Sequence, residues 1–214
     1  MNPYQVVKDF EQALCDYTGA KYAVTTTSCT MALLLACRWH AITQLIPNQT
    51  VTIPKHTYVS VPMSIIHAGF NVRFAKNWNW LGYYQLHPLP VFDCARWFSE
   101  DMYSADPPYR EDHKYDGNML CVSFHWSKTL AIGQGGAILH DNDEADEWFR
   151  MARFDGRKEG VAPRDQKDWV LGYHCYMSPR DAADGLSRLT VLPKYNDPLP
   201  NDDYPDLSQL EIFK

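Results

Sequence analysis

One lysine, Lys128, lies in a stretch of sequence that could make its amine reactive. Apolar runs that favour β-strands, Met119–Phe124 and Ala137–Leu139, flank the polar turn that carries it. The segment Gly133-Gln-Gly-Gly136 lets the chain turn closely before the second strand. Desolvation between apolar strands disfavours the ammonium form, so we expect the pKa of Lys128 to fall. A neutral amine can attack a carbonyl and form a Schiff base, whereas the simpler interpretation is an exposed lysine in a hairpin loop.

Hydroxyl side chains gather where a predicted strand runs into a helix rich in alanine and leucine. The segment reads Thr25-Thr-Thr-Ser-Cys-Thr30 and continues Met-Ala-Leu-Leu-Leu-Ala. At such a helix start the free backbone N–H groups and the helix dipole attract a phosphate, and the hydroxyls of Ser28 and Thr30 can add donors. The simpler interpretation is an ordinary helix N-cap.

A carboxylate, Asp93, ends the strand predicted within Leu89–Trp97. In α/β folds the carboxyl ends of parallel strands face the ligand crevice, so Asp93 is a candidate ligand-binding residue. A strand-end aspartate also serves as a cap or turn residue. The neighbouring segment Lys76–Pro90 is rich in tryptophan and tyrosine, which could contact a sugar, contact a partner chain or pack in the core.

The elements that must position these residues follow from the spacing of apolar side chains. Those of Tyr4–Tyr17 recur at helical spacing, and Gly19 is placed to end that helix. A helix is also predicted over Asn142–Arg153, where acidic residues come early and arginines late. We further predict a helix at Val61–His67 and strands at Tyr22–Thr25, Val51–Pro54 and Gly69–Phe74.

Composition excludes several classes of protein. With 214 residues the chain is long enough for one large domain, and its net charge of −6 argues against a surface that tracks nucleic-acid phosphates. No apolar run approaches the length of a membrane span, and the first residues lack the pattern of a signal peptide, so we expect a cytoplasmic protein. The six cysteines form no Cys-x-x-Cys pair and the histidines show no metal-ligand spacing, so we expect reduced core cysteines and no metal site.

The segment Ser123-Phe-His-Trp-Ser-Lys128, followed by Gly133-Gln-Gly-Gly136, resembles the signature Ser-Phe-His-x-x-Lys … Gly-Glu-Gly-Gly of the DegT/DnrJ/EryC1/StrS family, with Gln134 in place of glutamate. These are sugar aminotransferases that use pyridoxal 5′-phosphate (PLP). The resemblance implies an α/β fold, the three-layer α/β/α large domain of the aspartate-aminotransferase fold (fold type I). It also implies that Lys128 forms the Schiff base with PLP and then shuttles protons.

Further motifs occur in the family's order. The turn Ser28-Cys-Thr30 resembles the family's Ser-Gly-Thr, which implies that Ser28, Cys29, Thr30 and Ser123 hold the PLP phosphate. Cys29 would strain the site if the family's glycine requires a positive φ or a close approach to the phosphate. The resemblance further implies that Tyr58 stacks on the pyridine ring, that Asp93 binds the ring nitrogen and that Arg96 approaches a cofactor oxygen. His174 stands where a family asparagine reaches the PLP phosphate of the neighbouring subunit, and Tyr176 replaces an arginine.

The resemblance covers about Phe10 to Leu192. We therefore predict a PLP-binding large domain at 1–192 and an irregular, acidic, proline-rich tail at 193–214, with no counterpart of the family's small C-terminal domain. The implied activity is transamination of a keto-sugar nucleotide with an amino-acid donor, expected to be glutamate, in a homodimer with a shared active site. Two alternatives stay open: a protein that kept the fold and binds PLP, a nucleotide sugar or a partner without turnover, and another PLP reaction such as racemisation or elimination.

Overall fold

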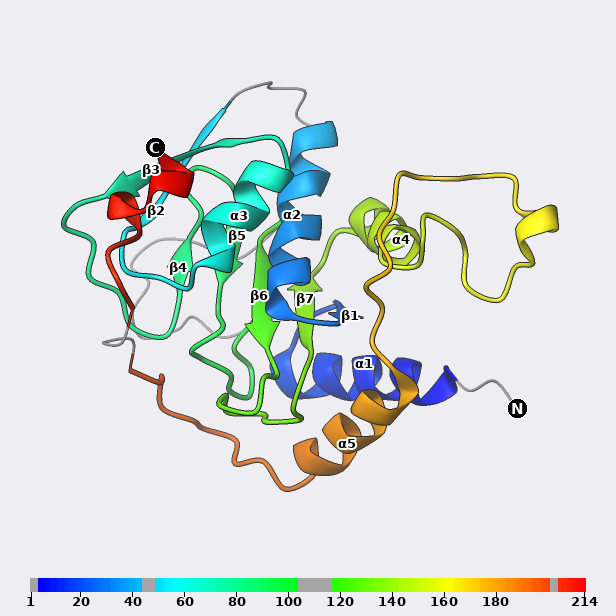
Figure 1. Cartoon of the computed structure of the whole chain (residues 1–214). Helices are drawn as coiled ribbons and strands as arrows, with labels where there is room; N and C mark the ends of the chain where they lie inside the picture. The colour runs from blue at the N-terminus through cyan, green and yellow to red at the C-terminus, as the bar shows by residue number, and fades with distance from the viewer. Residues whose placement is uncertain (1–3, 44–48, 104–116, 201–203) are drawn as a thin grey trace.

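A five-stranded mixed sheet forms the middle of the molecule (Figure 1). The computed structural model describes residues 4–43, 49–103, 117–200 and 204–214. The strands of this sheet are β1 (Tyr22–Thr26), β4 (Tyr84–Gln85), β5 (Val91–Asp93), β6 (Met119–Ser123) and β7 (Gly136–His140), in the spatial order β1-β7-β6-β5-β4. β5 and β6 run parallel, and the other neighbours are antiparallel. A separate parallel pair, β2 (Thr50–Pro54) and β3 (Asn71–Ala75), lies beside the sheet.

Helices cover both faces of the sheet and complete three layers. α2 (Cys29–Thr43), α3 (Ser60–His67) and α4 (Asp143–Ala152) share one apolar cluster, and α1 (Gln5–Thr18) and α5 (Pro179–Leu189) share the other. Alternate strand residues supply the two clusters: Ile138 packs toward α2, whereas Ala137 and Leu139 pack toward α1. Short 3₁₀ helices are found at Pro163–Asp165, Leu207–Gln209 and Glu211–Phe213. The α/β three-layer prediction is therefore confirmed.

Most predicted elements occur close to their expected bounds. The first helix ends with Gly19 in the left-handed conformation (φ 77°), and the Gly19 N–H donates to the Cys15 carbonyl at 2.9 Å. The apolar runs on either side of Lys128 pair as antiparallel β6 and β7. The aromatic segment Lys76–Pro90, which the sequence left unplaced, contains the short edge strand β4. None of the helices within the described residues is both long and apolar enough to cross a membrane.

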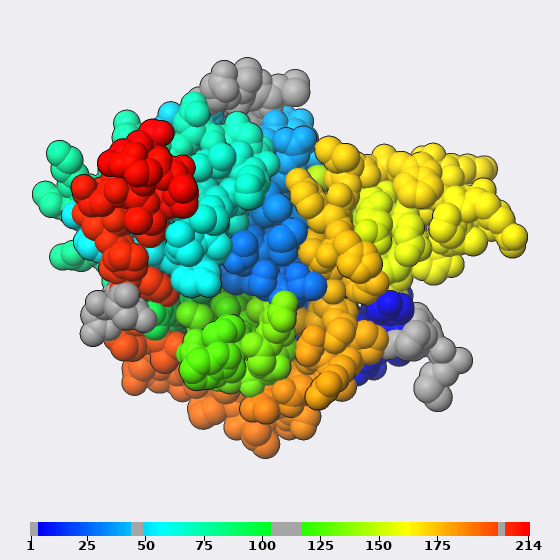
Figure 2. Space-filling model, viewed as in Figure 1, coloured from blue at the N-terminus to red at the C-terminus, as the bar shows by residue number. Residues whose placement is uncertain are grey.

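A buried ion-pair network joins α1, β1 and α4. Glu11 is 4% exposed and accepts hydrogen bonds from Arg150, Arg153 and the backbone N–H of Thr25. Burial alone raises the pKa of Glu11, but the two guanidinium groups and these hydrogen bonds outweigh it and lower the pKa to about 2. The network therefore fixes a charged carboxylate inside the fold and ties the two helical layers to the sheet. Beyond α4, the segment that carries Pro163–Asp165 projects from the body of the molecule (Figure 2).

Candidate active site

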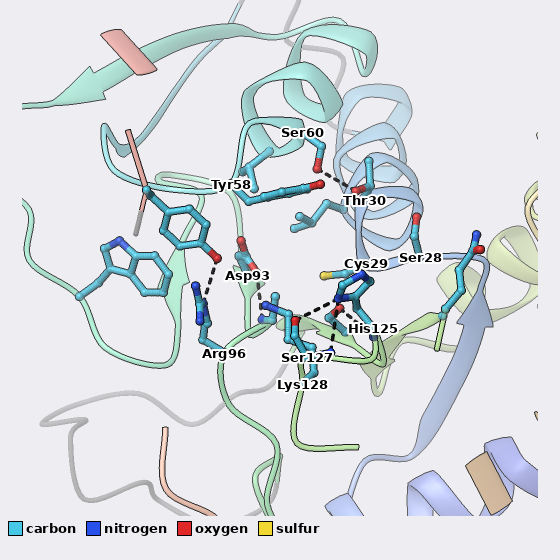
Figure 3. A pocket seen from close by; sticks show the side chains of 18 residues that line it. Ser28, Cys29, Thr30, Tyr58, Ser60, Asp93, Arg96, His125, Ser127 and Lys128 are labelled. Atoms are coloured by element: carbon cyan, nitrogen blue, oxygen red, sulfur yellow. Dashed lines mark hydrogen bonds between the residues drawn. The ribbon is translucent and has the colours of Figure 1, made fainter. Parts of the chain in front are cut away.

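Several chain segments converge on one cavity of about 270 Å³ (Figure 3). β1, β5 and β6 run in the same direction, because β7 is antiparallel to both β1 and β6. Their carboxyl ends therefore lie at one edge of the sheet, where ligands bind in open α/β sheets. Eight of the nine predicted site residues line the cavity: Ser28, Cys29, Thr30, Tyr58, Asp93, Arg96, Ser123 and Lys128.

Asp93 is the buried acid of the cavity. One carboxylate oxygen accepts the Tyr84 hydroxyl at 2.9 Å, and the other accepts the backbone N–H of Ala95 at 2.9 Å. Because the Tyr84 proton is donated to Asp93, the Thr57 hydroxyl donates to the Tyr84 oxygen, at 2.5 Å. Burial raises the pKa of Asp93 above its ordinary value, and these hydrogen bonds together with the positive charges of Lys128 and Arg96 offset that rise only in part. The carboxylate is thus fixed in orientation and suited to pair with a charged N–H donor.

The amino end of α2 forms a second wall of the cavity. The Ser28 hydroxyl accepts the backbone N–H of Met31 at 3.3 Å, so this residue acts as the helix cap that the simpler interpretation predicts. It also lines the cavity, where its own proton remains a donor. The Thr30 hydroxyl lies 2.7 Å from that of Ser60, which the sequence did not single out. Hydroxyls and a helix dipole together make this wall attractive to an anion.

Cys29 does not have the positive φ that would strain a residue with a side chain, and whether it crowds a bound phosphate stays a prediction. It is the first residue of α2, and among the residues that the structure describes only Asp101 and Asp155 combine a side chain with a positive φ. The Cys29 thiol points to the Cys121 carbonyl oxygen at 3.5 Å, and burial raises its pKa well above the ordinary value. The close approach is made by Gly136, where a Cβ would lie 2.4 Å from the Cys29 backbone nitrogen. The glycine that this contact requires is therefore on β7.

Lys128 lies in the turn between β6 and β7, and the backbone of that turn is well braced. The Lys128 N–H donates to the His125 carbonyl at 2.9 Å, and the Trp126 N–H donates to the Gly133 carbonyl at 3.1 Å. Lys128 lines the cavity together with Asp93 and Cys29, and its positive charge offsets part of the rise that burial causes in the pKa values of both. The turn therefore holds the amine at the cavity next to the buried acid. The expectation that the Lys128 amine is neutral remains a prediction.

Aromatic side chains border the open side of the cavity. Tyr58 is 57% exposed, and its ring meets the Tyr204 ring edge-on at 6.5 Å between centroids. Tyr204 and Trp80 also line the cavity, and Arg96 donates its Nε–H to the Tyr204 oxygen at 2.9 Å. Trp80 belongs to the aromatic segment for which a sugar contact was one of the open interpretations, whereas Tyr204 was not predicted for the site. Tyr204 belongs to the tail that the sequence shows as irregular, so no local pattern could have identified it.

His174 is the one predicted site residue that does not line this cavity. Its side chain is 73% exposed, and its Nδ1 lies 3.0 Å from an Asp155 carboxylate oxygen. The imidazole packs edge-on against Tyr176, which in turn contacts Phe154. This position fits the expectation that His174 serves a neighbouring subunit, and that role stays a prediction.

Comparison with known proteins agrees with this geometry. The sequence profile of the "DegT/DnrJ/EryC1/StrS aminotransferase family" matches residues 1–77 and 114–198. GDP-perosamine synthase of Caulobacter vibrioides is 26% identical over 215 residues, which cover 86% of this chain and 56% of that protein. The sugar aminotransferase CalS13 of Micromonospora echinospora superposes with a TM-score of 0.71 at 20% identity, over 88% of this chain and 61% of that one.

The structure of a third similar protein contains PLP. It is the E. coli GDP-4-keto-6-deoxy-D-mannose-3-dehydratase "with bound hydrated PLP", with a TM-score of 0.69 at 17% identity over 88% of this chain and 61% of that one. The chain spans a little under three fifths of the length of the curated relatives that it matches. Residues 78–113, which include Asp93 and Arg96, lie outside the profile match, so their placement in the site comes from the geometry.

Proposed function

This chain belongs to the DegT/DnrJ/EryC1/StrS aminotransferase family, and on that premise we propose that it is a PLP-dependent aminotransferase. Its substrates are a keto-sugar nucleotide and an amino-acid donor, with glutamate as the expected donor. The observation that carries the proposal is the meeting of Lys128, Asp93 and the amino end of α2 around one cavity. An amine, a buried acid and an anion-binding helix start are the three groups that PLP chemistry requires of a protein.

The donor set of the cavity fits PLP. Asp93 can pair with the protonated pyridine nitrogen, because its carboxylate lines the cavity and is held in a fixed orientation by the Tyr84 hydroxyl and the Ala95 N–H. Ser28, Thr30 and Ser123 offer hydroxyls for the phosphate near the α2 dipole. Tyr58 offers an exposed ring face for stacking. Lys128 is the residue that would form the Schiff base with the cofactor aldehyde.

PLP, when bound, supplies an electron sink that stabilises negative charge on a carbon attached to the substrate nitrogen. The chain's own residues then do three things. Lys128 Nζ accepts a proton as general base and returns it as general acid. Asp93, held by Tyr84 and Ala95, keeps a proton on the ring nitrogen. Tyr58 and the α2 wall fix the orientation of the ring.

The substrate class rests on the relatives. Two of the three similar proteins carry the name of a GDP-linked sugar, and one of these sugars is a keto sugar. The protein named for the keto sugar is a dehydratase, whereas the resemblance implies that the family's dehydratases lack the lysine present here as Lys128. The lysine therefore favours amino transfer for this chain.

The proposal includes a homodimer in which His174 serves the partner's site. Its support is that His174 is exposed and lies away from the cavity of its own chain, and that Trp126 and Leu171 are 71% and 76% exposed. Mixing His174→Ala with Lys128→Ala chains tests this arrangement, because a shared site regenerates one intact site per mixed dimer. Activity that does not recover on mixing, although mixed dimers form, would argue against sharing.

The deciding experiment is an absorbance spectrum with added PLP, before and after borohydride, followed by mass mapping. We expect a band near ~420 nm that borohydride abolishes, with the reduced cofactor fixed to Lys128. Lys128→Ala should show neither the absorbance band nor the fixed cofactor. Lys167→Ala, at an exposed lysine, is the matched control. Amino transfer from glutamate to a keto-sugar nucleotide then tests turnover.

Two negative results would mean different things. Fixation of PLP without any transfer would leave the binding protein as the better interpretation, and this alternative is relevant because the chain spans under two thirds of its relatives' length. No band from folded protein would remove the PLP proposal itself.

A further inference from the structure

The C-terminal segment 204–214 is part of the site although it lies beyond the family profile match, which ends at residue 198. Figure 2 shows this segment, in red, packed on the body of the molecule. Its first residue, Tyr204, lines the same cavity as Lys128 and Asp93. The segment therefore adds to the site a side chain that the matched part of the family does not provide.

Three contacts fix the backbone next to Tyr204. The Leu207 N–H donates to the Lys55 carbonyl at 2.9 Å, and the Leu207 side chain is fully buried. The Lys55 ammonium lies 2.7 Å from an Asp206 carboxylate oxygen. The His56 Nδ1 lies 3.1 Å from the Tyr204 carbonyl oxygen. Lys55 and His56 directly follow β2 and precede Tyr58, so the segment is anchored to the element that supplies the expected stacking residue.

The Tyr204 side chain holds the Arg96 guanidinium. Arg96 Nε donates to the Tyr204 hydroxyl oxygen at 2.9 Å, and the guanidinium carbon lies 4.9 Å from the centre of the Tyr204 ring. Trp80 braces the ring in turn, with stacked planes 17° apart and centroids separated by 6.2 Å. An arginine side chain has several rotatable bonds, so two contacts from one rigid ring strongly limit where its charge can lie.

We propose that Tyr204 is a positioning residue of this site, which acts by holding Arg96 in the geometry that the ligand requires. The inference rests on the proposed function for the identity of the ligand, PLP. Arg96 faces the cavity that contains Asp93, and its charge is close enough to lower the pKa of that acid. A fixed guanidinium there offers a directed cationic donor to an anionic oxygen of the cofactor.

A double-mutant cycle on PLP affinity tests this coupling. Tyr204→Phe removes the hydroxyl and keeps the ring, so we expect PLP binding to weaken by about 3- to 10-fold. Arg96→Ala should weaken it by at least as much. Because Tyr204 acts through Arg96, adding Tyr204→Phe to Arg96→Ala should produce no further loss. Additive losses, or an unchanged affinity in Tyr204→Phe, would overturn the proposal. Tyr195→Phe, at a tyrosine that is 67% exposed in the same tail, is the matched control.

A second readout does not involve PLP. Phenylglyoxal modifies accessible guanidinium groups, and mass mapping follows the rate at Arg96 alone. We expect Tyr204→Phe to speed this modification several-fold, with Arg157 as the internal reference in the same sample. An unchanged rate refutes the proposal whether or not PLP binds. A faster rate in a protein that binds no PLP would instead uphold the Tyr204–Arg96 contact and refute the proposed cofactor.

Discussion

Two buried histidines should make the folded state sensitive to mild acid. His140, at the end of β7, is fully buried, and burial together with the Arg150 charge lowers its pKa from 6.5 to about 4. His40, in α2, is 6% exposed, and burial lowers its pKa from 6.5 to about 4 as well. In both cases the unfolded chain binds the proton more tightly. The free energy of unfolding therefore falls as the pH drops from about 6.5 to about 4.

The size of the decrease in the free energy of unfolding follows from the two pKa shifts. Between pH 7.5 and pH 5, each histidine should lower the free energy of unfolding by about 2 kcal/mol, so the pair contributes about 4 kcal/mol. This is a large part of the stability of an ordinary domain. Glu11 affects the free energy of unfolding in a different pH range. Because its pKa is about 2 in the folded protein, its stabilising effect is lost only as the pH falls below about 4.5. The decrease in the free energy of unfolding between pH 7.5 and pH 5 therefore comes mainly from the two histidines.

Urea unfolding at a series of pH values is the assay. His140→Phe cannot titrate and keeps a ring against Phe149, whose ring lies 5.3 Å from that of His140. Between pH 7.5 and pH 5, we expect the free energy of unfolding of His140→Phe to fall by about 2 kcal/mol less than that of the unaltered protein. For each protein we compare the free energy of unfolding at pH 7.5 with that at pH 5. A change in packing caused by the substitution affects both values alike and therefore cancels. His67→Asn, at an exposed histidine, is the control. If His140→Phe and His40→Leu both keep the full pH dependence, the argument from burial is wrong.

Four substitutions test other parts of the structure. Glu11→Gln leaves two guanidinium groups without their buried carboxylate, so we expect unfolding in urea to show a loss of about 4 kcal/mol; a loss below about 1 kcal/mol would contradict the network. Gly136→Ala places a Cβ against the α2 backbone, so it should lower the free energy of unfolding by about 3 kcal/mol and weaken PLP binding. Gly133→Ala has open space around it and should lower the free energy of unfolding by only about 1–2 kcal/mol, because of its left-handed φ. Cys29→Gly restores the family residue, yet it should lower stability by about 1 kcal/mol without tightening PLP binding, as titration with PLP would show.

Local patterns explain why much of the site was predictable. Strand ends can be read from apolar runs, and the carboxyl ends of β1, β5 and β6 meet because those strands share a direction. Ser28, Asp93 and Ser123 follow directly from that rule once the strands are placed. The turn that carries Lys128 is braced by hydrogen bonds between residues of the same turn, so its structure also follows from neighbouring residues.

Other features depend on contacts between distant segments. Cys29 has no positive φ, and the close backbone contact beside it is made by Gly136 of β7. The tail was predicted as irregular; its described residues include two short 3₁₀ helices, and Tyr204 enters the site through anchors at Lys55 and Leu207. No periodicity marks such a residue, because a single anchored side chain leaves no repeating pattern.

The sequence by itself determined the three-layer α/β fold, the order of its elements and the candidate residues Lys128, Asp93 and Ser28. These depend on apolar spacing and short motifs, which act over a few neighbouring residues. The tertiary structure decided which acid is buried and how it is held, namely Asp93 by Tyr84, and that Tyr204 fixes Arg96. The physical reason is that burial and long-range hydrogen bonds arise only when distant segments pack together, and these two effects set the charge and orientation of each group in the site.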